Sequence, residues 1–172
     1  MEVRKIYPPV TPFLQVELEH NIVDYLWKII DIAKTINKNH KDKLVGNISQ
    51  SLLLEDRNSF FYKTVCVPLV KYYRKNNSSA FGGDPVSQNT LLGPNSKLVL
   101  NKFWVNYQYE TEFNPYHNHK GVYSFAIWLK IPYAWEEQKK LLQFNDIEEK
   151  HIKAGNFEFE YSDINGDIIN YG

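Results

Sequence analysis

Two histidines one residue apart, His117 and His119, are the strongest chemical signal in the sequence. They lie in the segment NPYHNHKG (114–121), between the apolar stretches KLVLNKFWVNYQY and VYSFAIWLKIPY. Side chains at positions i and i+2 of an extended backbone point to the same side, so the two imidazoles could reach one point in space. Neutral imidazole binds iron, zinc, copper and nickel, and two histidines with one further ligand form open, reactive metal centres. The spacing therefore predicts the beginning of a metal site.

Two other interpretations of the pair compete with a metal site. An isolated histidine is most often a surface or core residue that is hydrogen-bonded to its neighbours. The string His-Asn-His also appears in the name of a nuclease class, but those nucleases spread their residues along a ββ-metal finger and need a basic surface. Here 20 basic residues balance 20 acidic ones. We therefore expect no nucleic-acid partner.

The composition indicates one folded domain over residues 1–172, long enough to bury a core. Apolar residues make up 43% of the chain and aromatic residues 15%, which favours sheet over a helical bundle. The single Cys66 excludes an internal disulfide, and this favours a reducing compartment. No apolar run approaches the length of a membrane span. We expect a cytoplasmic protein, in the host cell if it is viral, with no membrane partner.

The hydrophobic pattern changes from a helical period to a strand period near residue 96. Two helices followed by antiparallel strands predict an α+β chain, with a helical part at 1–95 and a strand part at 96–172. The predicted helices are 21–38, with Asn21 as N-cap, and 58–75, which Pro68 kinks or begins. The first should bury Ile22, Leu26, Ile29, Ile30, Ala33 and Ile36 on one face, and the second Phe61, Val65, Leu69 and Tyr72. The predicted strands are 13–19, 49–54, 97–109, 121–131, 141–144 and 156–162, with a hairpin turn at Asn165-Gly166.

The stretch FWVNYQYETEFNPYHNHKGVYSFAIWLKIPYAWEEQ resembles the core of phage-type 2-oxoglutarate/Fe(II)-dependent oxygenases, a prolyl-4-hydroxylase-like family. Three blocks carry the resemblance: Trp-x-Asn, Asn-Pro-x-His-x-His and Ser-Phe-x-x-Trp-x-Lys-x-Pro. Similar segments upstream and downstream extend it over nearly the whole chain. The resemblance implies a double-stranded β-helix (jelly roll) with the two helices packed outside it. It also implies a dioxygenase that uses Fe(II), 2-oxoglutarate as cosubstrate and ascorbate as reductant.

Carried over by position, the resemblance makes His117 the first metal ligand. His119 lies where the wider superfamily places a carboxylate, so it is either a ligand in a His-x-His variant or a neighbour of the true ligands. Asn106 and Ser124 lie on strands that should line the barrel and are candidates for cosubstrate binding, although a buried, satisfied Asn106 is an equally good interpretation. The family points to a protein side chain such as proline as substrate.

The family pattern continues to a distal histidine and an arginine that binds the carboxylate of 2-oxoglutarate. The sequence reaches Gly172 without them, and Arg4, Arg57 and Arg74 all lie in the helical half. His151, in a charged loop-like stretch, is a weak substitute for the third ligand. We expect either an oxygenase that continues beyond Gly172 or a short form with an incomplete site.

Residues 1–172 alone are then expected not to turn over 2-oxoglutarate. An unpaired strand edge would favour a homodimer. The alternatives are a non-catalytic jelly-roll binding or accessory module and a zinc- or nickel-binding cupin-like protein.

Overall fold

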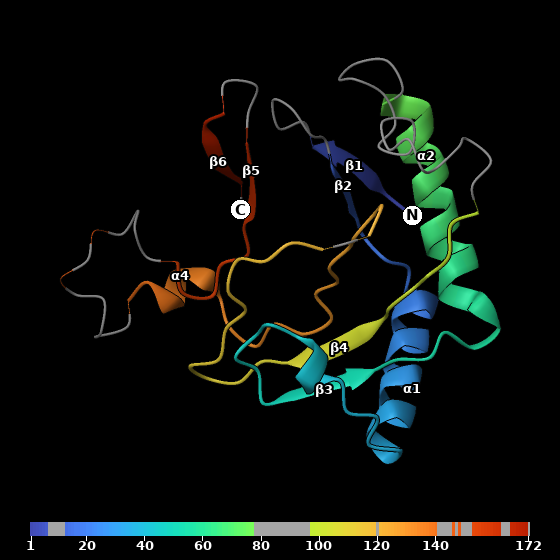
Figure 1. Cartoon of the computed structure of the whole chain (residues 1–172), viewed down its shortest axis with the longest axis horizontal. Coiled ribbons are helices and arrows are strands. Elements are labelled where there is room, and N and C mark those ends of the chain that lie inside the picture. Colours follow the sequence, from blue (N-terminus) through green and yellow to red (C-terminus); the bar gives the residue numbers. More distant parts are fainter. Residues whose placement is uncertain are drawn as a thin grey trace. The chain divides into compact units, whose positions relative to one another are not determined.

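The computed structural model describes residues 1–6, 13–77, 97–119, 121–140, 146, 148, 153–162 and 166–171. The chain divides into two compact units, Met1–Tyr123 and Ser124–Gly172. Figure 1 shows the elements of both, but the relative position of the two units is not determined. The strand predicted at 141–144 lies outside the described residues. In the part of the chain that is described, no helix is both long and apolar enough to cross a membrane.

Helix α1 (His20–Thr35) confirms the first predicted helix, although both ends differ from the predicted 21–38. The N-cap is Glu19 in an extended conformation rather than Asn21, and no side chain caps this end. Ile36, expected on the buried face, is 59% exposed because the helix has ended before it. The rest of the predicted apolar face is buried: Ile22, Leu26, Ile29, Ile30 and Ala33.

The C-terminal end of α1 is set by Asn37, whose φ of 46° is in the left-handed region. The Asn37 N–H donates to the Lys34 carbonyl at 3.0 Å, and the Lys38 N–H donates to the Ala33 carbonyl at 3.2 Å. These two bonds form a Schellman motif, which satisfies carbonyls that the helix leaves without partners. The helix therefore stops at Thr35, not at the predicted Lys38.

The second predicted helix is a composite of three helical types. A 3₁₀ turn (Arg57–Ser59) and a π-helix (Tyr62–Cys66) precede helix α2 (Val67–Asn77). Pro68 has no N–H and cannot donate to the carbonyl four residues earlier, which favours a wide turn just before it. The extra residue in a π turn rotates the face that follows, so Tyr72 is 39% exposed although Phe61 and Val65 are buried as predicted.

Three two-stranded antiparallel sheets account for the described strands. In the first unit, β1 (Val3–Ile6) pairs with β2 (Phe13–Val16), and β3 (Gln50–Leu53) pairs with β4 (Trp104–Tyr107). The predicted strands at 13–19, 49–54 and 97–109 are thus found in shortened form, whereas β1 was not expected. Residues 38–40 run along the other edge of β3, where the Leu53 N–H donates to Lys38 and the His40 N–H donates to Ser51, both at 2.9 Å.

Helix α1 lies on one face of the β3–β4 sheet. Leu52 on this face is buried, and the Lys34 Nζ of α1 lies 4.9 Å from the centroid of the Tyr107 ring. Because side chains alternate along a strand, Trp104 and Asn106 lie on the opposite face. In the observed register, Leu53 pairs with Trp104 and Ser51 pairs with Asn106, so these four residues share that face.

The strand predicted at 121–131 is wrong, because all of these residues are described and none is in a strand. Alternating apolar residues suggest a strand, but a strand also needs a neighbour to pair its backbone groups. Phe125, Trp128 and Ile131 are instead about half exposed, at 49%, 56% and 51%. A jelly roll requires two facing sheets of several strands. With only two-stranded sheets in the described residues, that architecture stays a prediction.

The second unit contains a short helix, α4 (Trp135–Gln138), and a hairpin of β5 (Phe159–Ser162) and β6 (Ile168–Tyr171). The hairpin confirms the signal at Asn165-Gly166, although residues 163–167 rather than two residues connect the strands. Gly166 has a φ of 87°, which glycine adopts without strain; Asn165 lies outside the described residues.

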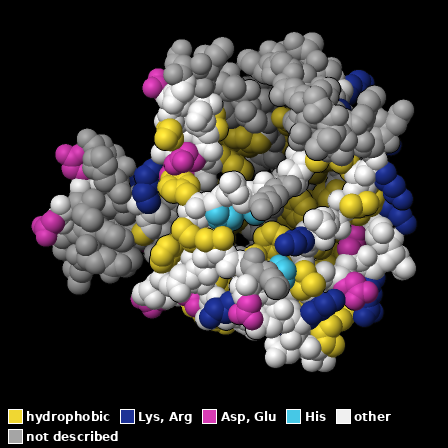
Figure 2. Space-filling model, in the orientation of Figure 1, with side chains coloured by type: hydrophobic (Ala, Val, Ile, Leu, Met, Phe, Trp, Pro, Cys, Tyr) yellow, Lys and Arg dark blue, Asp and Glu magenta, His cyan; other side chains and the backbone are white. Residues whose placement is uncertain are grey.

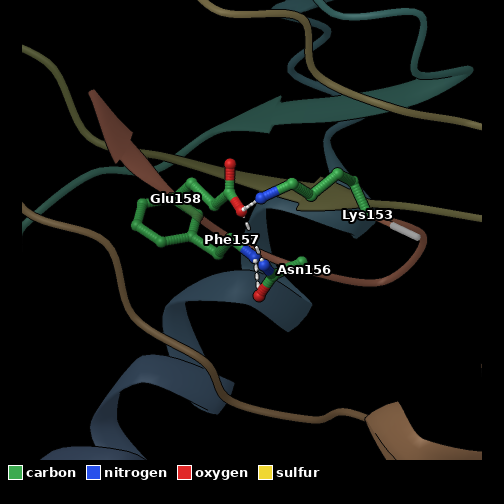
Figure 3. Close-up of polar contacts among 4 residues, drawn as sticks. All are labelled: Lys153, Asn156, Phe157 and Glu158. Atoms are coloured by element: carbon green, nitrogen blue, oxygen red, sulfur yellow. Dashed lines mark hydrogen bonds and ion pairs between the residues drawn. The ribbon is translucent and has the colours of Figure 1, made fainter. Parts of the chain in front are cut away.

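The turn before β5 is closed by the carboxylate of Glu158. Lys153 Nζ pairs with Glu158 Oε1, and Asn156 Nδ2 donates to the same oxygen at 2.9 Å (Figure 3). The Phe157 N–H donates to Asn156 Oδ1 at 3.0 Å. Gly155, with a φ of 73°, completes the turn where a Cβ would lie 2.9 Å from the Tyr133 ring.

Candidate metal centre

The structure brings His117 and His119 together, as their spacing predicts. Their ring centroids are 4.8 Å apart, with 53° between the ring planes. Both side chains are exposed, and histidine side chains reach the surface on the face drawn in Figure 2. Both belong to the irregular segment that follows β4, within the first unit.

One hydrogen bond orients His117. Its Nδ1 lies 2.7 Å from the Pro115 carbonyl oxygen. A carbonyl can only accept, so Nδ1 carries the proton and Nε2 keeps its lone pair. Metal-binding histidines typically make this bond, because it fixes both the tautomer and the orientation of the ring.

The spacing of the rings fits a shared metal ion. Two imidazoles that bind one ion through nitrogens at about 2.1 Å, with an angle of about 100° between them, have centroids about 5 Å apart. In the described part of the chain, no group of three or more His, Cys, Asp or Glu side chains is placed to hold a metal. Among the described residues, the two histidines are therefore the candidate ligands.

The His119 ring lies against the indole of Trp104. The two centroids are 6.1 Å apart, and the planes are within 18° of parallel. Partial desolvation, together with the charge of His117, lowers the pKa of His119. A lowered pKa favours the neutral imidazole, the form that binds metals. The ring of His40, which is only 9% exposed, also lies near Trp104, with centroids 5.8 Å apart.

The backbone before the histidines is tied to residues 46–49. Asn47 and Phe113 exchange two backbone hydrogen bonds, of 2.8 and 3.3 Å. Glu112 accepts from the Ser49 N–H at 2.9 Å and from the Tyr109 N–H at 3.0 Å, and its hydrogen bonds with these two residues lower its pKa. A Cβ at Gly46 would overlap the side-chain oxygen of Asn114, so a larger residue here would have to displace that side chain.

The other predicted site residues have separate positions. Asn106 is half-buried, and its Oδ1 accepts a hydrogen bond from the Ser51 hydroxyl at 2.8 Å. This bond supports the interpretation of Asn106 as a satisfied polar residue. Its NH₂ group is the part to consider for ligand binding. Ser124 is exposed in the second unit and is not placed relative to the histidines. His151 lies outside the described residues. Burial, and then the charge of Asp56, raises the pKa of Cys66 to about 11, which makes its thiol a poor ligand at neutral pH.

Sequence reasoning did not find His40, Ser51 or Gly46 as neighbours of the site. Each contacts its partner across a long stretch of chain, so no local motif joins them. The one signal in the sequence is strand alternation, which puts Trp104 and Asn106 on one face, so a residue that pairs with either of them has to lie on a neighbouring strand.

No family model, no curated protein and no solved structure matches this chain.

Proposed function

We propose that this chain is an Fe(II)- and 2-oxoglutarate-dependent dioxygenase that hydroxylates a C–H bond, with His117 and His119 as metal ligands. The observation that carries the proposal is the pair of imidazoles 4.8 Å apart, one of them oriented by the Pro115 carbonyl. The resemblance of residues 103–138 to phage-type oxygenases supports the reaction class and suggests a protein side chain such as proline as substrate.

In this proposal, bound iron supplies the chemistry by which O₂ oxidises 2-oxoglutarate to succinate and CO₂ and inserts one oxygen atom into the substrate C–H bond. Ascorbate keeps the iron reduced. The chain itself holds the metal, with the tautomer of His117 fixed by Pro115. Asn106 offers its amide NH₂ group to the cosubstrate, because its oxygen already accepts from Ser51.

Metal binding is the first test. Co(II) replaces Fe(II) as a probe because its absorption bands report the ligands around it. The His117→Ala variant should abolish binding, which we expect to be micromolar or weaker with two histidines. His20→Ala, which removes an exposed histidine at the start of α1, is the matched control and should bind as the unmodified chain does. Unchanged binding in His117→Ala would return the pair to the interpretation of ordinary surface histidines.

Succinate formation separates an oxygenase from a binding or accessory module. Residues 1–172, and any longer product of the same reading frame, are incubated with Fe(II), ascorbate and 2-oxoglutarate. The proposal requires His117-dependent succinate above the iron-only background from the longer product, and residues 1–172 alone are expected to give none. Metal binding with no His117-dependent succinate in either form would favour the accessory module.

A further inference from the structure

Among the described side chains of the metal centre, Trp104 is the one whose ring lies near two imidazoles. One neighbour is His119, nearly parallel to the indole at 6.1 Å and 18°. The other is the buried His40, at 5.8 Å and 43°. The sequence separates these three residues widely, so only the fold creates this arrangement. The role proposed above for the histidine pair does not use Trp104.

The backbone of Trp104 is held in the β3–β4 sheet. Trp104 in β4 pairs with Leu53 in β3, and the carbonyl of the preceding residue, Phe103, accepts a hydrogen bond of 2.8 Å from the Leu54 N–H. His40 is anchored to the same sheet, because its N–H donates to Ser51 at 2.9 Å. The indole is therefore carried by paired strands, whereas His119 lies in an irregular segment.

This contrast matters because the last torsion of a histidine side chain is intrinsically broad. A histidine on an irregular segment would sample many ring orientations, and ordering it would weaken metal binding. A flat indole surface parallel to the ring restricts that rotation. The hydrogen bond to Pro115 does the same for His117, so each imidazole has its own restraint.

We propose that Trp104 is a positioning residue that holds the imidazole of His119 in its metal-binding orientation by stacking on it. The inference rests on the proposed function of the histidine pair. Trp104 touches neither metal nor substrate and acts only through His119. Partners that orient a metal ligand typically contribute about tenfold or more to affinity.

The test compares two substitutions of Trp104 with one elsewhere. Trp104→Leu removes the aromatic face, and Trp104→Phe keeps a smaller one. Trp128→Leu is the matched control, because Trp128 is an exposed tryptophan of the second unit that contacts Phe157. We expect Co(II) to bind about tenfold more weakly to Trp104→Leu, with altered absorption bands. Trp104→Phe should lose less than about threefold, and Trp128→Leu should not change.

A second measurement needs no metal. The imidazole NMR signals of His119 should carry a ring-current shift from the indole, which Trp104→Leu abolishes and Trp128→Leu preserves. If Trp104→Leu does not fold, Trp104→Met replaces it, since methionine fills apolar space without a flat ring.

Wild-type affinity in a folded Leu or Met variant would overturn the proposal, as would equal losses in the Phe and Leu variants. Failure of the proposed function is distinguishable, because it would leave binding unchanged in His117→Ala whatever the ring-current shift shows.

Discussion

At the scale of single residues, the histidine segment depends on the carboxylate of Glu112, which lies outside the histidine motif. Glu112 bonds the backbone N–H groups of Ser49 and Tyr109, at 2.9 and 3.0 Å. It thereby links the segment that leads to His117 with residues 47–49. A carboxylate that accepts bonds from backbone N–H groups favours its charged form. The direction of its pKa shift gives a pH-dependent prediction.

Because the pKa of Glu112 is lowered on folding, its contribution to stability is present above the unfolded-state value of about 4.3 and is lost as pH falls through the folded value. Glu112→Gln should therefore unfold at a lower urea concentration than the unmodified chain at pH 7. The difference should shrink as pH falls below the unfolded-state value and should close below the folded value, where the Glu112 carboxyl is protonated in both states. Urea midpoints measured from pH 7 to pH 3 check this. Glu110→Gln, an exposed neighbour, is the control, and an equal effect there would contradict the prediction.

At the scale of elements, Asp56 organises the start of the composite helix. Its carboxylate accepts from the Phe61 N–H at 2.8 Å, the Tyr62 N–H at 2.9 Å and the Tyr25 hydroxyl at 2.7 Å. The first two bonds satisfy N–H groups that every helix start leaves without partners. The third connects this start to α1. Burial, and then the bond to Asp56, raises the pKa of Tyr25, so the phenol remains a donor.

Asp56→Ala removes the acceptor from all three donors at once. We expect the free energy of unfolding to fall by about 2–4 kcal/mol, from a lost helix cap and part-buried donors without partners. Chemical denaturation followed by circular dichroism measures this. Asp31→Ala, which removes an exposed carboxylate 3.9 Å from Lys34 on α1, should change stability by less than about 0.5 kcal/mol. Similar losses in both variants would show that Asp56 does not cap the helix.

At the scale of the whole molecule, every buried apolar side chain of the described residues lies in the first unit. They come from α1, from β3 and its flanks, from the composite helix and from the residue before β4: Ile22, Leu26, Ile29, Ile30, Ala33, Ile48, Leu52, Leu54, Phe61, Val65 and Phe103. Phe61 and Phe103 stack with centroids 4.9 Å apart, which joins the composite helix to the start of β4. None of these buried side chains belongs to Trp104, which lies beside His119 and is only half-buried.

Substitutions of apolar side chains should lower the free energy of unfolding more in the first unit than in the second. Leu26→Ala, at a side chain only 1% exposed, should lower the free energy of unfolding by about 2–5 kcal/mol through lost burial and a residual cavity. Phe159→Ala, at a side chain 42% exposed, should lower it by about 1 kcal/mol, mainly through the ring contact with Phe157. Thermal and urea unfolding measure both. A larger loss for Phe159 would show that the second unit contributes more to the core than the first.

The local sequence pattern was sufficient to predict those structural features that depend only on residues close together in the chain. The apolar face of α1 follows from a 3.6-residue period, the strand around 49–54 from its apolar run, and the hairpin of β5 and β6 from Asn165-Gly166 between alternating residues. The meeting of His117 and His119 also follows from spacing alone. The ends of helices were harder to predict from the sequence, because the end of α1 depends on the left-handed conformation of Asn37.

Only the tertiary structure decided what surrounds the histidines. Trp104 reaches His119, Ser51 reaches Asn106, and Ser49 reaches Glu112 across long stretches of sequence. Contacts of this kind depend on which strands pair and in which register. The alternation of apolar and polar residues along a strand specifies neither. The same gap produced the wrong strand at 121–131, where the apolar pattern is present but none of the described residues pairs with it as a strand. The sequence by itself identified the two histidines as candidate metal ligands, while the fold determined which residues lie next to them, because those neighbours come from segments that the chain order keeps apart.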